Sequence, residues 1–386
     1  MKNKTFADKT FADKTIAYLT KGTLGFSIIS IFLGFIIGAI ILAIAGFNPI
    51  QAYGVMISGV ISRPSYIAWT IIGSTPIIIT ALSIAFAFKT GLFNIGAEGQ
   101  FIIGGITAAI VGYFVELPSF LHIPLVLLAA MTAAGLWGGI AGFLKAKFGV
   151  HEVISTIMLN WIALYLNNYI VLIEGFRRAT SQRTHEIQRT ANIVILEQWK
   201  RSPEGREWLR GHDFFGDALR TPLNWGFVIA IILAIIVWYT LNKTTLGYEL
   251  KAVGYNRHAA EYGGINVSRS MFTSMVISGA LAGAAGGLHV MGISKSIASL
   301  AAMEGFGFNG IAVALIGGNS SLGIIFSGLL FSALQYGGSK IQPALGAPSE
   351  VIHIMIGAIV FFIAMPKLIK YILHNIKKKR GAKNAG

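Results

Sequence analysis

The sequence predicts an all-α, polytopic membrane protein with about ten transmembrane helices, one of them short or re-entrant, and with both termini in the cytoplasm. Of the 386 residues, 54% are hydrophobic and only 12% are charged, whereas soluble domains carry about 25% charged residues. No Asp, Glu, Lys or Arg occurs between Lys21 and Arg63, and one spanning helix needs only about 20 apolar residues. The alternating pattern of a membrane β-barrel is absent from the sequence.

Ten apolar segments are the predicted helices, and 305–318 is the segment expected to be short or re-entrant. The segments are approximately 24–46, 67–88, 100–115, 123–144, 153–173, 223–241, 270–291, 305–318, 321–337 and 351–372. No A-x-A cleavage site follows the first segment, which is therefore predicted to be a retained helix. The chain is expected to divide into an N-terminal cytoplasmic tail (1–22), a transmembrane domain (23–373) and a basic cytoplasmic tail (374–386). A direct repeat at Phe6–Thr15 is assigned no function.

The distribution of Lys and Arg predicts the orientation. Nineteen of the 31 basic residues fall in the two tails and in alternate loops, and the short loops of the other side hold only Arg63, Lys295 and Lys340. Cytoplasmic loops are enriched in Lys and Arg, whereas long segments cross the membrane largely regardless of charge. Both termini are therefore expected inside, with an even number of spans. The net charge of +15 reflects this topology, so the lipid bilayer rather than nucleic acid is the expected partner.

Two polar loops are long enough to form structure outside the membrane. Residues 174–222 are predicted to be extracytoplasmic, with nearly balanced charges and amphipathic stretches near Thr184–Trp199 and Pro203–Leu209. This loop is expected either to form a packed cap or to provide a docking surface for an external partner. Residues 242–269 form a cytoplasmic loop. Within it, Asn256 is the predicted N-cap and Gly263 the predicted end of a short helix, "RHAAEY", which suits presentation to a cytoplasmic partner.

The stretch Gly91–Gln100, "GLFNIGAEGQ", interrupts two apolar segments with glycines, amides and one carboxylate. Glycines permit turns and close backbone contacts, and a helical turn would place Asn94 and Glu98 on one face. One interpretation is a loop at the cytoplasmic edge with a solvated Glu98. The other is a broken polar segment that lines an internal pathway or its gate, since intramembrane carboxylates usually face a cavity or a partner.

Amide side chains recur in two later apolar segments. Asn160, Asn167 and Asn168 lie within 153–173, and Asn309 lies within the glycine-rich 305–318. Buried amides either bind hydroxyl groups of a ligand or form hydrogen bonds between helices, and the sequence alone leaves both alternatives open.

Several kinds of chemistry find no support in the sequence. There are no cysteines, and no histidine–carboxylate cluster has the spacing of a metal site. The nearest approach to a P-loop, Gly287–Ser296, has Ile293 at the lysine position, so any ATP would be hydrolysed by another chain. An intramembrane enzyme would have only the pair His151 and Ser155. An ion-coupled transporter would depend on a small set of titratable groups: Glu98, Glu152, His289 and Glu304.

Four blocks of sequence, in order, resemble the permease subunits of bacterial ABC importers for nucleosides and simple sugars. They are "GLFNIGAEGQ", "HEVISTIMLN", "AVGYNRHAAEYGGINVSRS" with "SGALAGAAGG", and "GFGFNGIAVALIGGN". The resemblance runs from about Thr75 to Met365. It departs from the family pattern in a turn where Arg and Pro are usual and Gly318 and Ser321 occur here. The first two blocks look more like the nucleoside branch than the sugar branch.

The resemblance implies partners and roles for particular residues. It implies a second related permease subunit, a cytoplasmic ABC ATPase that uses the ATP, and an extracytoplasmic substrate-binding lipoprotein. It also implies a location in the bacterial cytoplasmic membrane, with no cofactor or metal bound by this chain and no catalytic residue. The substrate pathway or gate would include Phe93, Asn94, Glu98, Gln100, Asn160 and Asn309. The contact with the ATPase would include Gly254, Asn256, Ala259, Ala260, Gly263 and Ile265.

Overall fold

The computed structural model describes residues 23–365, so the predicted tails, with the repeat at Phe6–Thr15, lie outside the described residues. Helices joined by turns make up the described chain, and β-structure is limited there to isolated bridges. The all-α prediction is therefore confirmed. The chain divides into two units, residues 1–57 with 337–386 and residues 58–336.

The first unit is held together by close packing of its first and last described helices. It contains α2 (Thr23–Ile44), most of α3 (Pro49–Ile61), α17 (Ile341–Leu345) and α18 (Ser349–Ala364). A Cβ atom on Gly34 of α2 would lie 2.8 Å from the Ile359 carbonyl oxygen of α18, so only glycine allows this approach. The Tyr53 hydroxyl of α3 donates to the Phe35 carbonyl at 2.6 Å, and the chain bends by 119° between α2 and α3.

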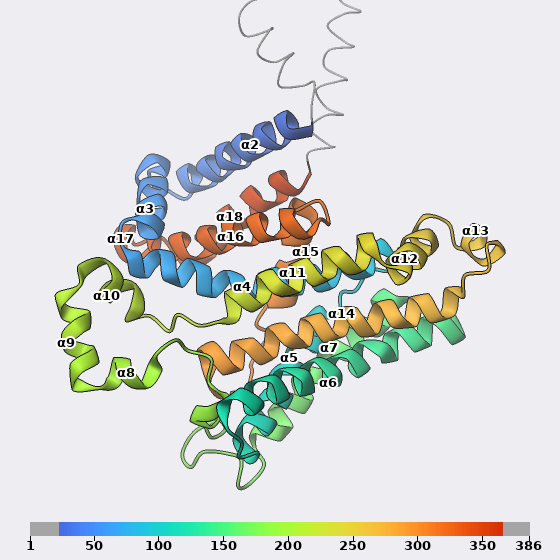
Figure 1. Cartoon of the computed structure of the whole chain (residues 1–386). Coiled ribbons are helices and arrows are strands. Elements are labelled where there is room, and N and C mark those ends of the chain that lie inside the picture. The colour runs from blue at the N-terminus through green and yellow to red at the C-terminus, as the bar shows by residue number, and fades with distance from the viewer. Residues whose placement is uncertain (1–22, 366–386) are drawn as a thin grey trace, which may run out of the picture. The chain divides into compact units, whose positions relative to one another are not determined.

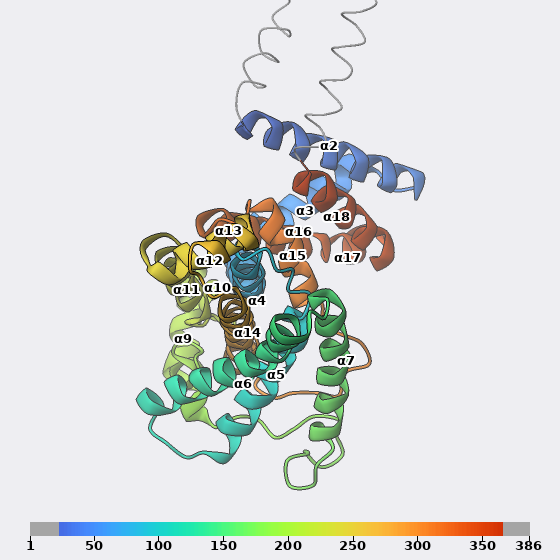
Figure 2. The same cartoon turned by 90° about the vertical axis from the view of Figure 1, so that its right-hand side faces the viewer.

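The second unit holds the remaining helices. In chain order they are α4 (Pro64–Lys89), α5 (Ala97–Phe114), α6 (Ser119–Phe148), α7 (Glu152–Val171), η1 (Arg189–Ala191), α8 (Glu197–Arg201), α9 (Pro203–Gly211), α10 (Asp213–Leu219), α11 (Gly226–Lys243), α12 (Thr245–Tyr255), α13 (Arg257–Tyr262), α14 (Val267–His289), η2 (Val290–Ser294), α15 (Phe306–Ile316) and α16 (Ser321–Gly338). Most of α4, α5 and α14 is buried, whereas only a third of α6, α7 and α11 is buried. In Figure 2, α14 and α4 accordingly lie between α11 on one side and α5 and α7 on the other.

Small residues allow α14 to pack tightly against α6. A Cβ on Gly279 would lie 2.4 Å from the Ala134 carbonyl oxygen, and one on Gly283 would lie 2.5 Å from the Ala130 carbonyl oxygen. Without such a Cβ, the two backbones can approach each other closely, as in other membrane helix pairs. Gly279 and Gly283, four residues apart, therefore mark the contact between α14 and α6.

Seven helices of the described chain are long and apolar enough to cross a membrane, or eight if the bent α2–α3 pair forms one span. The seven are α4, α5, α6, α7, α11, α14 with η2, and α16 with α17. The apolar helices α15 and α18 have only 11 and 16 residues. The prediction that 305–318 is short is confirmed, whereas the count of ten spans stays a prediction.

The two polar loops lie at opposite ends of the second unit, with α8–α10 at one end and α12–α13 at the other (Figure 1). Backbone hydrogen bonds attach the long loop to the helix ends: Thr184 N–H donates to Ile297 O at 3.0 Å, and Gln188 N–H to Gly112 O at 2.7 Å. The Asp217 carboxylate accepts from Ser65 N–H at 2.9 Å, and hydrogen bonding by Ser65, through its side chain first and its N–H second, lowers the Asp217 pKa. Residues 174–222 therefore pack against the rest of the second unit, and we call them the cap; their role as a docking surface stays a prediction.

Candidate functional site

The stretch "GLFNIGAEGQ" is a buried break between two central helices. Helix α4 ends at Lys89, α5 begins at Ala97, and the residues between them are not helical. Gly91 starts the break with φ of +72°, a conformation that favours glycine. The break then follows α14: the Thr90 hydroxyl donates to Ser274 Oγ at 2.9 Å, and Asn94 Nδ2 to Ser278 Oγ at 2.7 Å. This segment is therefore a buried connection between two separate membrane-crossing candidates, α4 and α5, and not a solvated edge loop.

The side chain of Asn94 folds the break back onto α5. Its Nδ2 also donates to Gln100 Oε1 at 2.8 Å, and its Oδ1 accepts from Gly96 N–H at 2.9 Å. Asn94 and Gln100 are 0% and 1% exposed. The prediction that Asn94 and Glu98 share one helical face is wrong, because Asn94 precedes the helix and its hydrogen bonds hold it toward Gln100 and Ser278.

Glu98 connects the start of α5 to the start of α15. Its Oε1 accepts from Gly305 N–H at 2.7 Å and its Oε2 from Gly307 N–H at 2.6 Å. The side chain is 0% exposed. The first N–H groups of a helix have no partner within the helix and carry partial positive charge. The buried carboxylate therefore satisfies two of these donors and places its negative charge where the α15 dipole stabilises it.

Asn160 of α7 fixes the other side of the break. Its Oδ1 accepts from Gly99 N–H at 2.8 Å, and its Nδ2 donates to Ile95 O at 3.0 Å. A Cβ on Gly99 would lie 2.8 Å from Asn160 Cα, so glycine is required for α5 and α7 to approach each other this closely. We call Asn94, Glu98, Gln100, Asn160 and Ser278 the polar junction.

Two predicted pathway residues lie outside the polar junction. The Phe93 ring packs edge-on against Phe88, with centroids 5.4 Å apart, and Asn309 is half-buried one turn into α15. Asn167 and Asn168 bind the chain after η2, with Asn167 Nδ2 donating to Ala298 O at 2.8 Å and Asn168 Oδ1 accepting from Leu300 N–H at 2.8 Å. These amides, like Asn160, form hydrogen bonds between segments of the chain. The structure therefore shows the alternative in which buried amides hold helices together.

Three of the residues considered for the alternative functions, His151, Glu152 and Ser155, have structural partners. Glu152 forms an ion pair with Lys145 at 2.9 Å. The Ser155 hydroxyl donates to backbone carbonyls of the preceding turn, and the His151 imidazole accepts from Val153 N–H. The two side chains therefore do not form a nucleophile–base pair.

The α12–α13 loop forms as the sequence predicts. Asn256 Oδ1 accepts from Ala259 N–H at 3.1 Å and caps α13, which ends at Tyr262 with Gly263 as C-cap. The left-handed residue, however, is Gly264, with φ of +84°. Ala260 packs in a core cluster with Ala87 and Leu92, and Ile265 packs against this cluster.

The loop is directly connected to the polar junction. A Cβ on Gly254 of α12 would lie 2.1 Å from the Lys89 carbonyl oxygen, so α12 rests on the last residue of α4. Leu92, which packs with Ala260, belongs to the break itself. A displacement of α12–α13 would therefore act on the backbone that leads to Asn94.

Two tyrosines, at the end of α12 and at the end of α13, were not singled out from the sequence. Tyr255 is 91% exposed and Tyr262 is 97% exposed. Tyrosine is enriched at protein interfaces because it combines a large apolar ring with a hydroxyl group. Their positions could have indicated them, since Tyr262 ends the predicted helix and Tyr255 lies two residues before it, and a short helix with one buried residue, Ala260, exposes its ends.

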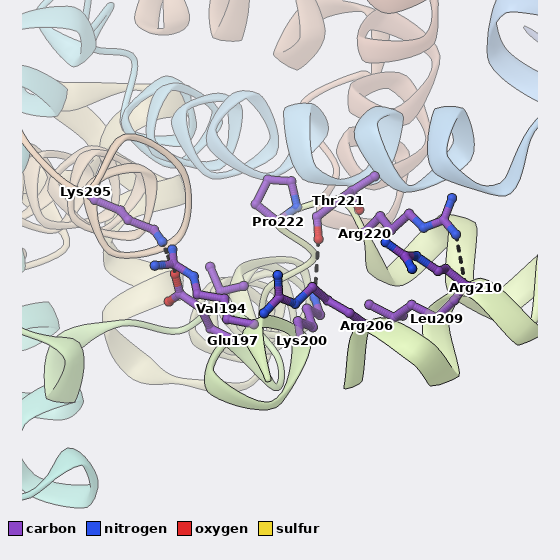
Figure 3. A pocket seen from close by; sticks show the side chains of 11 residues that line it. Val194, Glu197, Lys200, Arg206, Leu209, Arg210, Arg220, Thr221, Pro222 and Lys295 are labelled. Atoms are coloured by element: carbon purple, nitrogen blue, oxygen red, sulfur yellow. Dashed lines mark hydrogen bonds and ion pairs between the residues drawn. The ribbon is translucent and has the colours of Figure 1, made fainter. Parts of the chain in front are cut away.

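The cap contains a basic cavity of about 570 Å³. Six basic residues and one acidic residue are among those that line it: Lys200, Arg201, Arg206, Arg210, Arg220, Lys295 and Glu197. Figure 3 shows Lys295 reaching Glu197, and Lys200 pointing toward Thr221. Burial lowers the pKa of Lys200, and the Glu197 carboxylate opposes this shift. Because six basic residues and one acidic residue line it, the cavity carries an excess of positive charge.

Comparison with known proteins identifies the family. Residues 66–364 match the family described as "Branched-chain amino acid transport system / permease component". The chain belongs to this permease family. It is 40% identical to the guanosine ABC transporter permease protein NupP of Bacillus subtilis, over 91% of this chain and 96% of the relative. It is 37% identical to the nucleoside ABC transporter permease protein NupB of Lactococcus lactis, over 92% of this chain and 97% of the relative.

A more distant relative carries a different substrate name. The permease is 28% identical to the glucose ABC transporter permease protein TsgB13 of Haloferax volcanii, over 92% of this chain and 90% of that protein. No solved structure matches the chain. The resemblance to nucleoside and simple-sugar ABC permeases that the four sequence blocks indicate is confirmed.

Proposed function

We propose that this permease is the membrane-spanning subunit of an ATP-driven ABC importer that translocates nucleosides. The observation that carries the proposal is the 40% identity, over 91% of the chain, to a protein named as a guanosine permease. The buried polar junction supports it, because polar and ionisable side chains within membrane segments often mark a substrate pathway.

In this proposal the α12–α13 loop receives the motion of a cytoplasmic ATPase. The exposed Tyr255 and Tyr262 would contact the ATPase, while Ala260 and Gly254 would transmit the displacement to the break through their packing on Leu92 and Lys89. The permease itself binds no cofactor, and the partner subunit uses the ATP. A second related permease completes the membrane part of the importer.

The cap would face an extracytoplasmic substrate-binding lipoprotein. Its cavity holds six basic residues against one acidic residue, so it suits acidic side chains of such a partner. Charge complementarity of this kind mainly increases the association rate and makes it dependent on salt.

The proposed topology has ten spans and places both termini in the cytoplasm of a bacterial inner-membrane protein. The natural chain has no cysteine, so single cysteines report on sidedness without background. We expect Glu261→Cys in α13 to react with an impermeant maleimide only in inside-out vesicles, and Gln198→Cys in the cap to react only in intact spheroplasts. Labelling of both from the same side would refute the topology.

Uptake by the reconstituted importer tests the function. Proteoliposomes that contain the two permeases, the ATPase and the lipoprotein should accumulate labelled guanosine when ATP is supplied, and excess glucose or ribose should not compete. Accumulation of sugar without nucleoside would establish the sugar alternative, which the relationship to the glucose permease motivates. Uptake that is abolished by an ionophore and indifferent to ATP would establish an ion-coupled transporter.

A further inference from the structure

A small cavity adjoins the polar junction on the side of the cap. It lies between the first turns of α5, the end of α7, the end of α14 with η2, and the chain that follows η2. Glu304, at its edge, directly precedes Gly305, whose N–H donates to Glu98. We call this space the His289 cavity. None of the five polar-junction residues lines it, so it is a separate feature of the second unit.

Aromatic rings form one wall of the His289 cavity. Phe101 and His289 line it, with ring centroids 5.7 Å apart, and Phe306 packs behind them at 5.0 Å from Phe101 and 5.1 Å from His289. These separations fall within the range of about 4.5–7 Å that is favourable for aromatic pairs. Three helices, α5, α14 and α15, each contribute one of the rings. The wall therefore brings three aromatic rings together beside the cavity, where Phe101 keeps 4% of its surface exposed.

The imidazole of His289 has an unused hydrogen-bonding atom. Its Nδ1 is buried and has no hydrogen-bond partner among the described residues. A buried polar atom without a partner is unfavourable, and such an atom in a native structure calls for an explanation. A ligand in the cavity that presents a hydrogen-bonding ring edge would supply the missing partner.

The mouth of the cavity carries charges of both signs. Arg183 and Glu304 line it and interact electrostatically. Although much of Glu304 is exposed, desolvation of its carboxyl group raises its pKa, the nearby Glu98 adds to this shift and Arg183 opposes it. The lining contains one basic group and one acidic group besides His289, so it does not select an anion such as a phosphorylated nucleoside. A carboxylate and a guanidinium together can bind hydroxyl groups as acceptor and donor.

We propose that the His289 cavity is a binding subsite for the base of an uncharged nucleoside, which stacks on Phe101 and forms a hydrogen bond with His289. The ribose hydroxyl groups would then lie at the mouth, beside Glu304 and Arg183. The enclosed space is about 60 Å³, below the roughly 300–1,000 Å³ of sites that hold a whole small molecule. The cavity therefore takes only one end of the ligand, and the other end projects from the mouth. The subsite rests on the proposed function of nucleoside import.

The first test is guanosine uptake by the complete reconstituted importer. His289→Phe keeps a ring in the aromatic wall and removes both nitrogen atoms. We expect the KM for guanosine to rise about tenfold, as for the loss of one buried hydrogen bond, with little change in kcat. The matched control is His353→Phe, because His353 is exposed on α18, and its KM should remain that of the natural chain. An unchanged KM for His289→Phe would overturn the subsite.

The second test needs no change in the aromatic wall. Ser294→Cys places a single thiol in the lining of an otherwise cysteine-free chain, and guanosine, but not ribose, should slow its reaction with a maleimide. Equal protection by ribose, or no protection by guanosine, would overturn the base assignment. If the natural importer takes up guanosine while both tests fail, only the subsite is wrong. If it takes up no nucleoside, the proposed function and the subsite both fail.

Discussion

The polar junction and the α12–α13 loop both interrupt apolar helices with glycine and asparagine, but they use their polar groups differently. In the junction, Asn94, Glu98 and Asn160 are at most 1% exposed, and each accepts or donates at least two hydrogen bonds within the protein. In the loop, one asparagine caps a short helix, while Tyr255 and Tyr262 are almost fully exposed.

This difference separates two kinds of functional residue. The junction residues hold the start of α5 against α7, α14 and α15, so a substitution there changes the fold before it changes any contact with a substrate. The exposed loop residues contribute little to the fold, so a substitution there changes a contact with a partner. The effect of each substitution on stability should therefore decrease from the junction to the exposed face of the loop, while transport is lost in both.

The largest loss of stability is expected for Glu98→Gln. Glutamine has one side-chain oxygen, so it can accept from Gly305 or from Gly307, and its NH₂ group would face the other N–H donor. A buried donor without a partner costs about 1–3 kcal/mol, and the favourable charge at the start of α15 is lost as well. We expect a lower melting temperature in detergent and loss of guanosine uptake.

Glu116→Gln is the control for Glu98→Gln, because Glu116 is exposed in the loop between α5 and α6. It should melt like the natural chain. A Glu98→Gln protein with unchanged melting but no transport would assign the charge to the substrate pathway and not to the support of α15.

A smaller loss is expected for Gly99→Ala. The added Cβ would lie 2.8 Å from Asn160 Cα and from Asn160 Oδ1, so α5 and α7 would have to separate. Overpacking of this kind costs about 1–3 kcal/mol. Thermal melting should show the effect, and Gly105→Ala in the same helix is the control because its Cβ would meet its nearest neighbour at 3.6 Å. Equal melting of the two variants would show that the contact between α5 and α7 is not tight.

Asn256→Ala should have a local effect on α13. Loss of an N-cap costs about 1 kcal/mol, and α13 has only six residues, so the helix should fray without unfolding the bundle. Hydrogen exchange should increase at the amides of Ala259 and Ala260 and stay unchanged in α14. Asn256→Asp should restore protection, since aspartate is an equally good cap; a failure to do so would exclude capping as the role of Asn256.

The sequence predicted the α12–α13 loop better than the polar junction, and the reason is physical. Capping of α13 is a contact between Asn256 and Ala259, three residues apart, and such local signals are visible in sequence. The junction depends on Glu98 reaching Gly305, more than two hundred residues away. Glu98 and the glycines of Gly91–Gln100 were visible in the sequence, but the partner of the Glu98 carboxylate, Gly305, depends on tertiary packing. The span count was harder to predict, because the apolar 24–46 segment leads into a second helix, α3, across a bend of 119° that hydropathy does not reveal.

The smallest effect on stability, with full loss of transport, is expected for Ala259→Arg. Ala259 is exposed and Ala260 is 5% exposed in the cluster with Leu92, so the two neighbours form a matched pair. Surface substitutions usually change stability by less than about 0.5 kcal/mol, and Ala259→Arg should therefore melt normally while it blocks ATPase binding and guanosine uptake. Ala260→Arg should instead lower the melting temperature, because a charge would enter the core beneath α13. Normal uptake with Ala259→Arg and a normally bound ATPase would show that the exposed face of α13 is not the contact, and would remove the distinction drawn between this loop and the junction.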